Sequence, residues 1–141
     1  MDRAVIDTNV LTGMLLGRSG FNRQIFRACL ERRCQPLIGQ ALFMEYEDVL
    51  SRQKLFEQCL LSRKERQELF AAFLSTCEWV QVYFLWRPNL PDERDNHLVE
   101  LAVAGGATAI VTNNIRDFRK PELRFPTLNV QTPEQFLRSM K

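Results

Sequence analysis

Acidic residues at widely separated positions carry the most informative chemistry of this sequence, and Asp7, Glu45 and Asp95 are the foremost of them. Carboxylates that gather in a folded protein repel one another unless cations lie between them, and such clusters commonly bind divalent metal. Oxygen ligands suit hard ions such as Mg²⁺ or Mn²⁺. We therefore expect the fold to bring these acids together around a divalent metal.

Cysteine and histidine offer no competing metal chemistry. The four cysteines, Cys29, Cys34, Cys59 and Cys77, form no CxxC pair, and the single histidine, His97, does not complete a zinc set at finger-like spacing. We expect the cysteines to be reduced and mostly packed in the core. Carboxylates then remain as the plentiful metal ligands.

Asp7 stands at the end of a short apolar run and before a helical pattern. A carboxylate at the carboxyl end of a strand is well placed for ligands in an open parallel sheet. Thr8 and Asn9 are short polar residues that are able to orient it. The alternative is that Asp7 only caps the following helix, as aspartate often does.

Glu45 is expected to point inward. At 100° per residue it falls within the stripe of Ala41, Leu42 and Val49, whereas Glu47 lies on the opposite side. A buried carboxylate needs a cation, hydrogen bonds or a raised pKa to offset its desolvation. A salt bridge to a nearby arginine would also meet this need.

Asp95 leans toward the apolar side of its helix, because it precedes Leu98 by three residues and Ala102 by seven. Asp92 and Glu100 are expected to face away from that side. An acid in the first turn is also favoured by the helix dipole, so capping remains a second interpretation of Asp95.

The elements that must position these acids alternate along the chain. Short apolar runs predict strands and amphipathic stretches predict helices, and the Ser62 to Glu65 segment fits a capping box. Strands separated by helices indicate an α/β fold, a mainly parallel sheet of about five short strands with helices on both faces. The expected strands are 4–6, 36–38, 79–83, 109–112 and 128–130, and the expected helices follow Asp7 and cover about 21–33, 40–52, 63–76, 92–104 and the residues after 132.

Length and composition bound the protein class. We expect one domain over residues 1–141, with 45% hydrophobic residues and ten Phe for its core. The apolar runs are shorter than the roughly 20 residues of a membrane span, and the start of the chain lacks a signal-peptide pattern. A cytoplasmic protein without a membrane partner is expected.

Charge gives a weaker indication of the substrate. The net charge is only +2, but 15 of the 19 basic residues are arginine. Arginine grips phosphate bidentately, so an arginine-rich surface around an acidic site suits a phosphodiester. An ordinary solvated surface explains the same count.

Three blocks of the sequence resemble the PIN-domain family over nearly the whole chain: VIDTNVL, FMEYEDVLSR, and PDERDNHLVELAVAGGATAIVTNN followed by DF. The EY-x-x-VLSR segment, the D-x-x-DN-H helix start and the closing TPEQFL resemble the branch that contains VapC-like ribonucleases, toxin components of toxin–antitoxin pairs. The resemblance implies a single PIN-like domain and an Mg²⁺- or Mn²⁺-dependent endoribonuclease, with RNA as substrate, an antitoxin partner and a homodimer.

The resemblance places the motif acids at Asp7, Glu45 and Asp95. Many relatives carry a further acid where this chain has Asn114, so the fourth ligand is open between Asp117 and Asn114. Asp117 could instead be a surface residue. Loss of one acid would weaken a second metal first.

The mechanism expected from this set is hydrolysis by water, with Asp7 and Asp95 binding the main metal. Thr8, Asn9 and Thr112 would orient the ligands. The arginines expected to bind RNA phosphates are Arg87, Arg94, Arg116 and Arg119, and the alternative is that they are ordinary solvated surface residues. Phe84 or Trp86 is expected to stack on an unpaired base, and the alternative is that they form a hydrophobic lid over the sheet.

Two rival functions remain. The Asn114 position suggests a catalytically weakened PIN-like module that binds RNA or protein. A metal-dependent phosphatase with Asp7 as nucleophile is the other, but Asn9 stands where a D-x-D pair would have its second acid.

Overall fold

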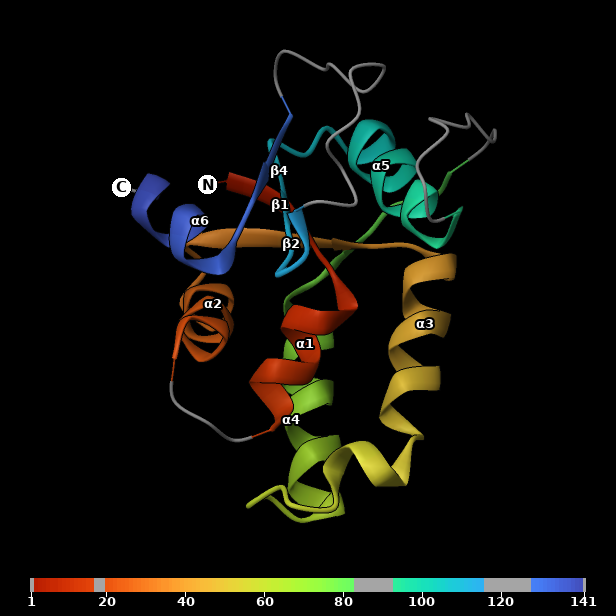
Figure 1. Cartoon of the computed structure of the whole chain (residues 1–141). Coiled ribbons are helices and arrows are strands. Elements are labelled where there is room, and N and C mark those ends of the chain that lie inside the picture. The colour runs from red at the N-terminus through yellow and green to blue at the C-terminus, as the bar shows by residue number, and fades with distance from the viewer. Residues whose placement is uncertain (1, 17–19, 83–92, 116–127, 141) are drawn as a thin grey trace.

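A computed structural model describes residues 2–16, 20–82, 93–115 and 128–140, with the backbone alone for 93–96. Its described part is an α/β fold (Figure 1). The elements in chain order are β1 (Asp2–Ile6), α1 (Thr8–Leu15), α2 (Phe21–Leu30), β2 (Cys34–Ile38), α3 (Gln40–Leu50), the 3-10 helix η1 (Gln53–Phe56), α4 (Arg63–Thr76), β3 (Glu78–Trp79), α5 (Glu93–Gly105), β4 (Ala109–Val111), β5 (Asn129–Gln131) and α6 (Pro133–Ser139).

The sheet is parallel throughout and has the strand order β3-β2-β1-β4-β5. The chain moves from β1 to β2 and β3 on one side, then crosses back to β4 and β5 on the other. The order therefore reverses between β1 and β4, where open α/β sheets form a crevice beyond the carboxyl ends of their strands. The register pairs Ile6 with Val111, so Asp7 and Thr112 emerge next to each other at this switch point.

Helices cover both faces of the sheet, as the sequence predicts. α5 packs on β1, β2 and β4, and α1, α2 and α4 form a layer on the other face (Figure 1). The face of α1 formed by Val10, Leu11, Met14 and Leu15 is buried.

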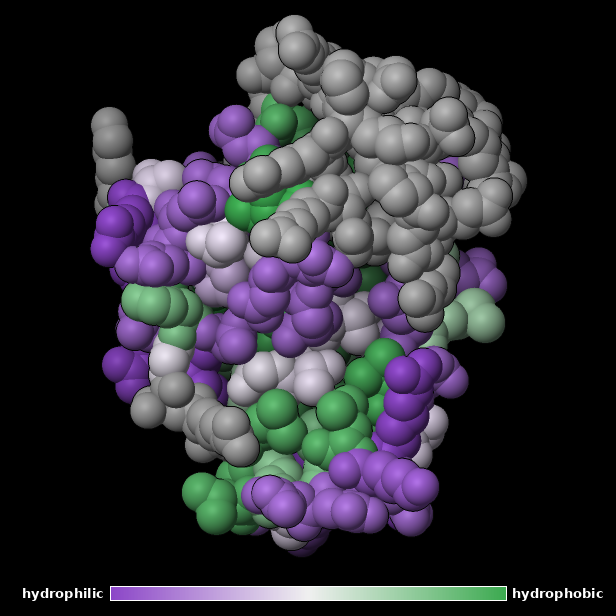
Figure 2. Space-filling model, viewed as in Figure 1, coloured by the Kyte–Doolittle hydropathy of each residue, from purple (hydrophilic) through white to green (hydrophobic). Residues whose placement is uncertain are grey.

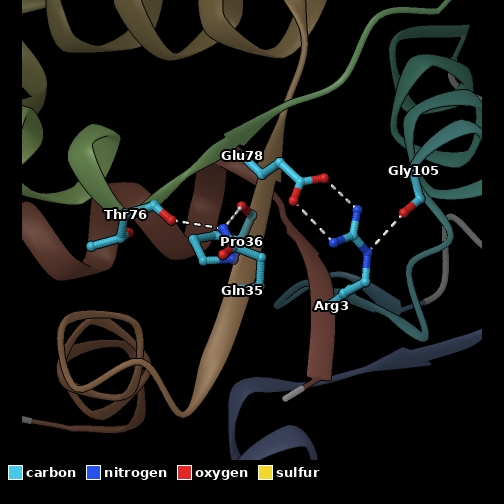
Figure 3. A network of polar contacts seen from close by, with 6 residues as sticks. All are labelled: Arg3, Gln35, Pro36, Thr76, Glu78 and Gly105. Atoms are coloured by element: carbon cyan, nitrogen blue, oxygen red, sulfur yellow. Dashed lines mark hydrogen bonds and ion pairs between the residues drawn. The ribbon is translucent and has the colours of Figure 1, made fainter.

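Hydrogen bonds of charged and polar side chains connect the strands to one another and to the ends of α4 and α5 (Figure 3). The Arg3 guanidinium donates from Nη1 and Nη2 to the two carboxylate oxygens of Glu78, and from Nε to the carbonyl of Gly105 at 2.9 Å. Hydrogen bonding to Arg3 lowers the pKa of Glu78. On β2, the Gln35 amide donates to the carbonyl of Thr76 at 2.7 Å.

Tyr46 connects α3 to the strand that carries Asp7. Its ring is fully buried against Phe70 and Phe73, and its hydroxyl donates to the carbonyl of Ile6 at 2.5 Å. Burial raises the pKa of this phenol well above its usual value, so it is a neutral donor. The end of β1 is thereby fixed to α3, the helix that carries Glu45.

Tyr46→Phe should lower the free energy of unfolding by about 1–3 kcal/mol, because a buried polar group loses its partner while the aromatic packing is kept. Urea unfolding followed by circular dichroism measures this loss. An unchanged midpoint and slope would show that the hydroxyl contributes nothing to the attachment of α3.

Several details differ from the sequence prediction. α2 ends at Leu30 rather than near residue 33, because Arg32 adopts a left-handed φ of 60°. Ala41 in α3 is exposed, although the helical pattern placed it on the inward stripe. Glu100, expected on the outer side of α5, is buried.

The surface drawn in Figure 2 shows hydrophobic residues gathered at the end of the molecule away from the sheet, around α1 and the connection from η1 to α4. Within the part of the chain that the structure describes, no helix is long and apolar enough to cross a membrane.

Candidate functional site

Asp7 is held rigidly at the end of β1. Its backbone N–H donates to the carbonyl of Val111 at 2.9 Å, and its side-chain Oδ1 accepts from the N–H of Thr8 at 2.7 Å. The second contact makes Asp7 the N-cap of α1. Asp7 therefore caps α1 with one carboxylate oxygen, and its second oxygen makes separate contacts.

That second oxygen, Oδ2, lies among the polar residues at the switch point. It accepts from the hydroxyl of Thr112 at 2.7 Å and from the amide of Asn9 at 3.3 Å. Asp7 is only 7% exposed. The expected neighbours of Asp7 are thus in contact with it, and Thr112 is itself fully buried.

Burial raises the pKa of Asp7, and the negative charge of Glu45 raises it further. Hydrogen bonds from Thr112 and Thr8 act in the opposite direction, as does the charge of His97. Among the described residues, the effects that disfavour an ionised Asp7 therefore outweigh those that favour it. A cation close to both carboxylates would offset this difference.

Glu45 reaches the same place from α3 with a half-buried carboxylate. Its Oε1 accepts from the hydroxyl of Thr8 at 2.8 Å, and its Oε2 lies 2.6 Å from Nε2 of His97. Thr8 therefore bridges the two acids, because its N–H holds Asp7 while its hydroxyl holds Glu45. The ionisable side chain that Glu45 contacts among the described residues is thus that of His97.

His97 was missed as a site residue. Because a carboxylate only accepts hydrogen bonds, Nε2 carries the proton of this contact. The other ring nitrogen, Nδ1, is buried and has no hydrogen-bond partner within the described chain. The available signal was its place two residues after Asp95, on the same helical turn as a candidate ligand.

The loop after β4 closes over the start of α1 through asparagines. The N–H of Asn113 donates to the side-chain carbonyl of Asn9 at 3.1 Å, and the N–H of Asn114 donates to the hydroxyl of Thr112 at 3.0 Å. The backbone of Asn114, one candidate for the fourth ligand position, therefore lies directly beside Thr112, which holds Asp7.

Asp95 is placed by its backbone alone, in the first turn of α5. His97 follows on the same turn and contacts Glu45, so this helix start adjoins the two described carboxylates. Several other expected residues lie outside the described residues: Asp117, Phe84, Trp86, Arg87, Arg116 and Arg119. The side chain of Arg94 does as well.

The described donors suit a hard divalent cation. Asp7 and Glu45 offer carboxylate oxygens, and the chemistry of such oxygens matches Mg²⁺ or Mn²⁺. No three described His, Cys, Asp or Glu side chains are grouped so that they could hold a metal ion.

Residues 3–116 match the sequence model of the family described as PIN domain. No curated protein sequence matches the chain significantly.

Two solved structures are similar in fold. One is VapBC2 from Rickettsia felis bound to a DNA fragment from their promoter, with a TM-score of 0.61 and 18% identity over 91% of this chain and 98% of that chain. The other is DNA-bound VapBC from Salmonella typhimurium, with a TM-score of 0.63 and 17% identity over 94% of this chain and 99% of that chain. At such identities the likeness establishes a shared fold.

Proposed function

The chain belongs to the PIN domain family, a family of nucleases, and from that premise we propose that it is a divalent-metal-dependent endoribonuclease. The observation that carries this proposal is the pair of carboxylates, Asp7 and Glu45, bridged by Thr8 at the switch point of the sheet. Paired acids beside a polar crevice suit metal-assisted hydrolysis of a phosphodiester.

We assign the metal ligands as the sequence suggests. Asp7 and Asp95 hold the main ion, and Glu45 supports it together with Asp117 or Asn114. The placement of Asp95 in the turn that carries His97 supports this assignment, since His97 already contacts Glu45. Mg²⁺ and Mn²⁺ both fit oxygen ligands of this kind.

When bound, the ion supplies Lewis-acid activation of water and stabilises negative charge on the phosphate. The residues of the chain do the positioning. Thr8 fixes one oxygen of each carboxylate, and Thr112 fixes the second oxygen of Asp7. His97 fixes the second oxygen of Glu45, so it is a positioning residue. Both carboxylates are therefore oriented before substrate arrives, which reduces the cost of assembling the site.

RNA is the proposed substrate. Arg87, Arg94, Arg116 and Arg119 flank the acidic segments in the sequence, and guanidinium groups bind phosphate well. Water is the attacking group, and the products are shorter RNA strands.

The nuclease assay uses purified protein and labelled single-stranded RNA, with Mn²⁺ or with EDTA. We expect cleavage with Mn²⁺, complete loss in EDTA, and recovery when excess Mn²⁺ is added back, because the carboxylates alone lack an activating cation. Cleavage that persists in EDTA would contradict metal dependence. RNA binding without any cleavage would favour the rival binding module suggested by Asn114.

We further propose that the chain is the toxin of a toxin–antitoxin pair, that it acts in the cytoplasm and that it forms a homodimer. The two similar structures are VapBC complexes bound to DNA, which supports an antitoxin partner by analogy of fold. Expression of the chain alone should arrest growth, and co-expression of a small neighbouring gene product should relieve the arrest. Harmless expression of an active nuclease would contradict this role.

A further inference from the structure

Two buried cysteines face each other at the turn between α2 and β2. The Sγ atoms of Cys29, in the last turn of α2, and Cys34, the first residue of β2, lie 3.3 Å apart. A disulfide bond is about 2.05 Å long, so the two atoms need to approach by only about 1.3 Å to form one. Both residues are free thiols in the structure. The pair is therefore a dithiol that is close to bonding distance.

The backbone holds the two cysteines in this arrangement. α2 ends in a Schellman motif, in which the N–H of Arg33 donates to the carbonyl of Ala28 at 2.9 Å. In the same motif the N–H of Arg32 donates to the carbonyl of Cys29 at 3.1 Å, and Arg32 has the left-handed φ of 60° that reverses the chain. Cys34 is held in turn by the pairing of β2 with β1. The contact between the two sulfur atoms is thus imposed by the main chain.

The two thiols differ in their acidity. The hydrogen bond between them lowers the pKa of Cys34 and raises the pKa of Cys29, which makes Cys29 the donor. The positive charge of Arg33 also lowers the pKa of Cys34, whereas burial acts in the opposite direction. The thiolate is the nucleophilic form of cysteine. Cys34 is therefore the first of the two to attack an oxidant, and Cys29 is the thiol beside it.

A cavity of about 490 Å³ adjoins the pair. Its lining combines three cysteines with polar residues, three of which Figure 3 shows: Cys29, Cys34 and Cys77, with Gln35, Thr76 and Glu78. A water molecule takes up roughly 30 Å³, so the cavity has room for an oxidant of similar size. Cys29 and Cys34 are only 1% and 2% exposed, which excludes bulky disulfide reagents. Hydrogen peroxide meets both conditions.

Cys77 lines the same cavity but is less suited to this reaction. Its Sγ donates to the carbonyl of Phe73 at 3.4 Å, and burial raises its pKa to about 12. It therefore stays protonated at neutral pH and supplies no thiolate. This residue serves as the internal control for the pair.

We propose that Cys29 and Cys34 form a peroxide-sensitive modification site, oxidised reversibly to a disulfide that joins the end of α2 to the start of β2. The Cys34 thiolate attacks one oxygen of hydrogen peroxide and the O–O bond breaks, which leaves a sulfenic acid on Cys34 and a hydroxide that takes up a proton. Cys29 then attacks the sulfur of the sulfenic acid and loses its proton, so that the S–S bond forms, the S–O bond breaks and water leaves. The two sulfurs lose two electrons in all, and the peroxide is reduced to two water molecules. This site is independent of the proposed nuclease function.

The test treats the purified full chain with hydrogen peroxide, alkylates the remaining thiols under denaturing conditions and maps a tryptic digest by mass spectrometry. Trypsin cuts after Arg27, Arg32, Arg33 and Arg52, so the disulfide appears as peptide 28–32 linked to peptide 34–52. The number of alkylated thiols should fall from four to two, because one disulfide consumes two, and dithiothreitol should restore all four. Alkylation of all four cysteines after peroxide, or a disulfide that joins other cysteines, would overturn the proposal.

Cys29→Ala separates the two steps of the reaction. Without the second thiol, peroxide should leave Cys34 as a sulfenic acid that dimedone labels, whereas disulfide formation should remove this label in the wild type. Cys77→Ala, the matched control from the same cavity, should give the same linked peptides in the same yield as the wild type. Dimedone on Cys77 rather than Cys34 in Cys29→Ala, or loss of the linked peptides in Cys77→Ala, would contradict the assigned pair.

Discussion

Asp7→Asn should reduce RNA cleavage by at least about 100-fold, because the variant removes the buried negative charge proposed to hold the main ion. The fold should survive this change. Burial raises the pKa of Asp7, so keeping its carboxylate ionised costs free energy that a neutral amide does not. A neutral amide of the same shape can still accept from the N–H of Thr8. Initial cleavage rates and thermal unfolding, measured on the same samples, test both parts.

Asp48→Asn is the matched control for this experiment. Asp48 is an exposed aspartate on α3, and its carboxylate pairs with Arg52 at 2.9 Å. Exposed pairs of this kind contribute little to stability, so cleavage and unfolding should both be unchanged. Wild-type activity in Asp7→Asn would remove the proposed role of Asp7. Loss of activity in both variants would point to a general effect of charge.

Glu45→Gln should lower cleavage about 10- to 100-fold, with part of the loss recovered at higher Mn²⁺ concentration. Glutamine keeps a carbonyl oxygen for the Thr8 hydroxyl but loses the charge that supports the ion. The dependence of the cleavage rate on Mn²⁺ concentration separates weaker metal binding from slower chemistry.

Glu47→Gln provides the comparison on the same helix. Glu47 is exposed two residues from Glu45, on the side where the sequence predicts no functional contact. Its substitution should leave the Mn²⁺ dependence unchanged. If Glu45→Gln behaves like Glu47→Gln, the two-carboxylate site is not the catalytic one.

Local signals in the sequence predicted much of the fold. The capping box at Ser62 and Glu65 fixes the start of α4, and the helix has the expected bounds of Arg63–Thr76. α5 ends at Gly105, close to the expected end near residue 104, and Gly106 follows with a φ of 66° that suits glycine. These features depend on neighbouring residues, which a sequence displays directly.

Features set by tertiary contacts were harder to predict. Arg32 takes a left-handed conformation without the usual Gly or Asn, so the end of α2 carried no signal. Glu100 is buried although its position in the helical pattern placed it outside. Helical periodicity assumes one apolar side, but α5 contacts α3 as well as the sheet.

Within the candidate site, the strand-end rule brought Asp7 and Thr112 together, and the structure places their side chains in contact. Glu45 reaches Asp7 through Thr8, as the inward direction of α3 suggested. Glu45 also pairs with His97, which lies 52 positions later in the sequence on another helix. No local sequence pattern reveals such a contact. Ligand roles for all these residues stay proposals.

Anomalous diffraction from crystals soaked in Mn²⁺ tests the central claim most directly, because it locates the ion without reference to activity. We predict one well-ordered peak within about 2.0–2.6 Å of a carboxylate oxygen of Asp7, with Asp95 as a second ligand and Glu45 beside it. A Mn²⁺ peak elsewhere, or Asp7 and Asp95 carboxylates more than about 8 Å apart, which is too far to share one ion, would contradict the proposed metal site.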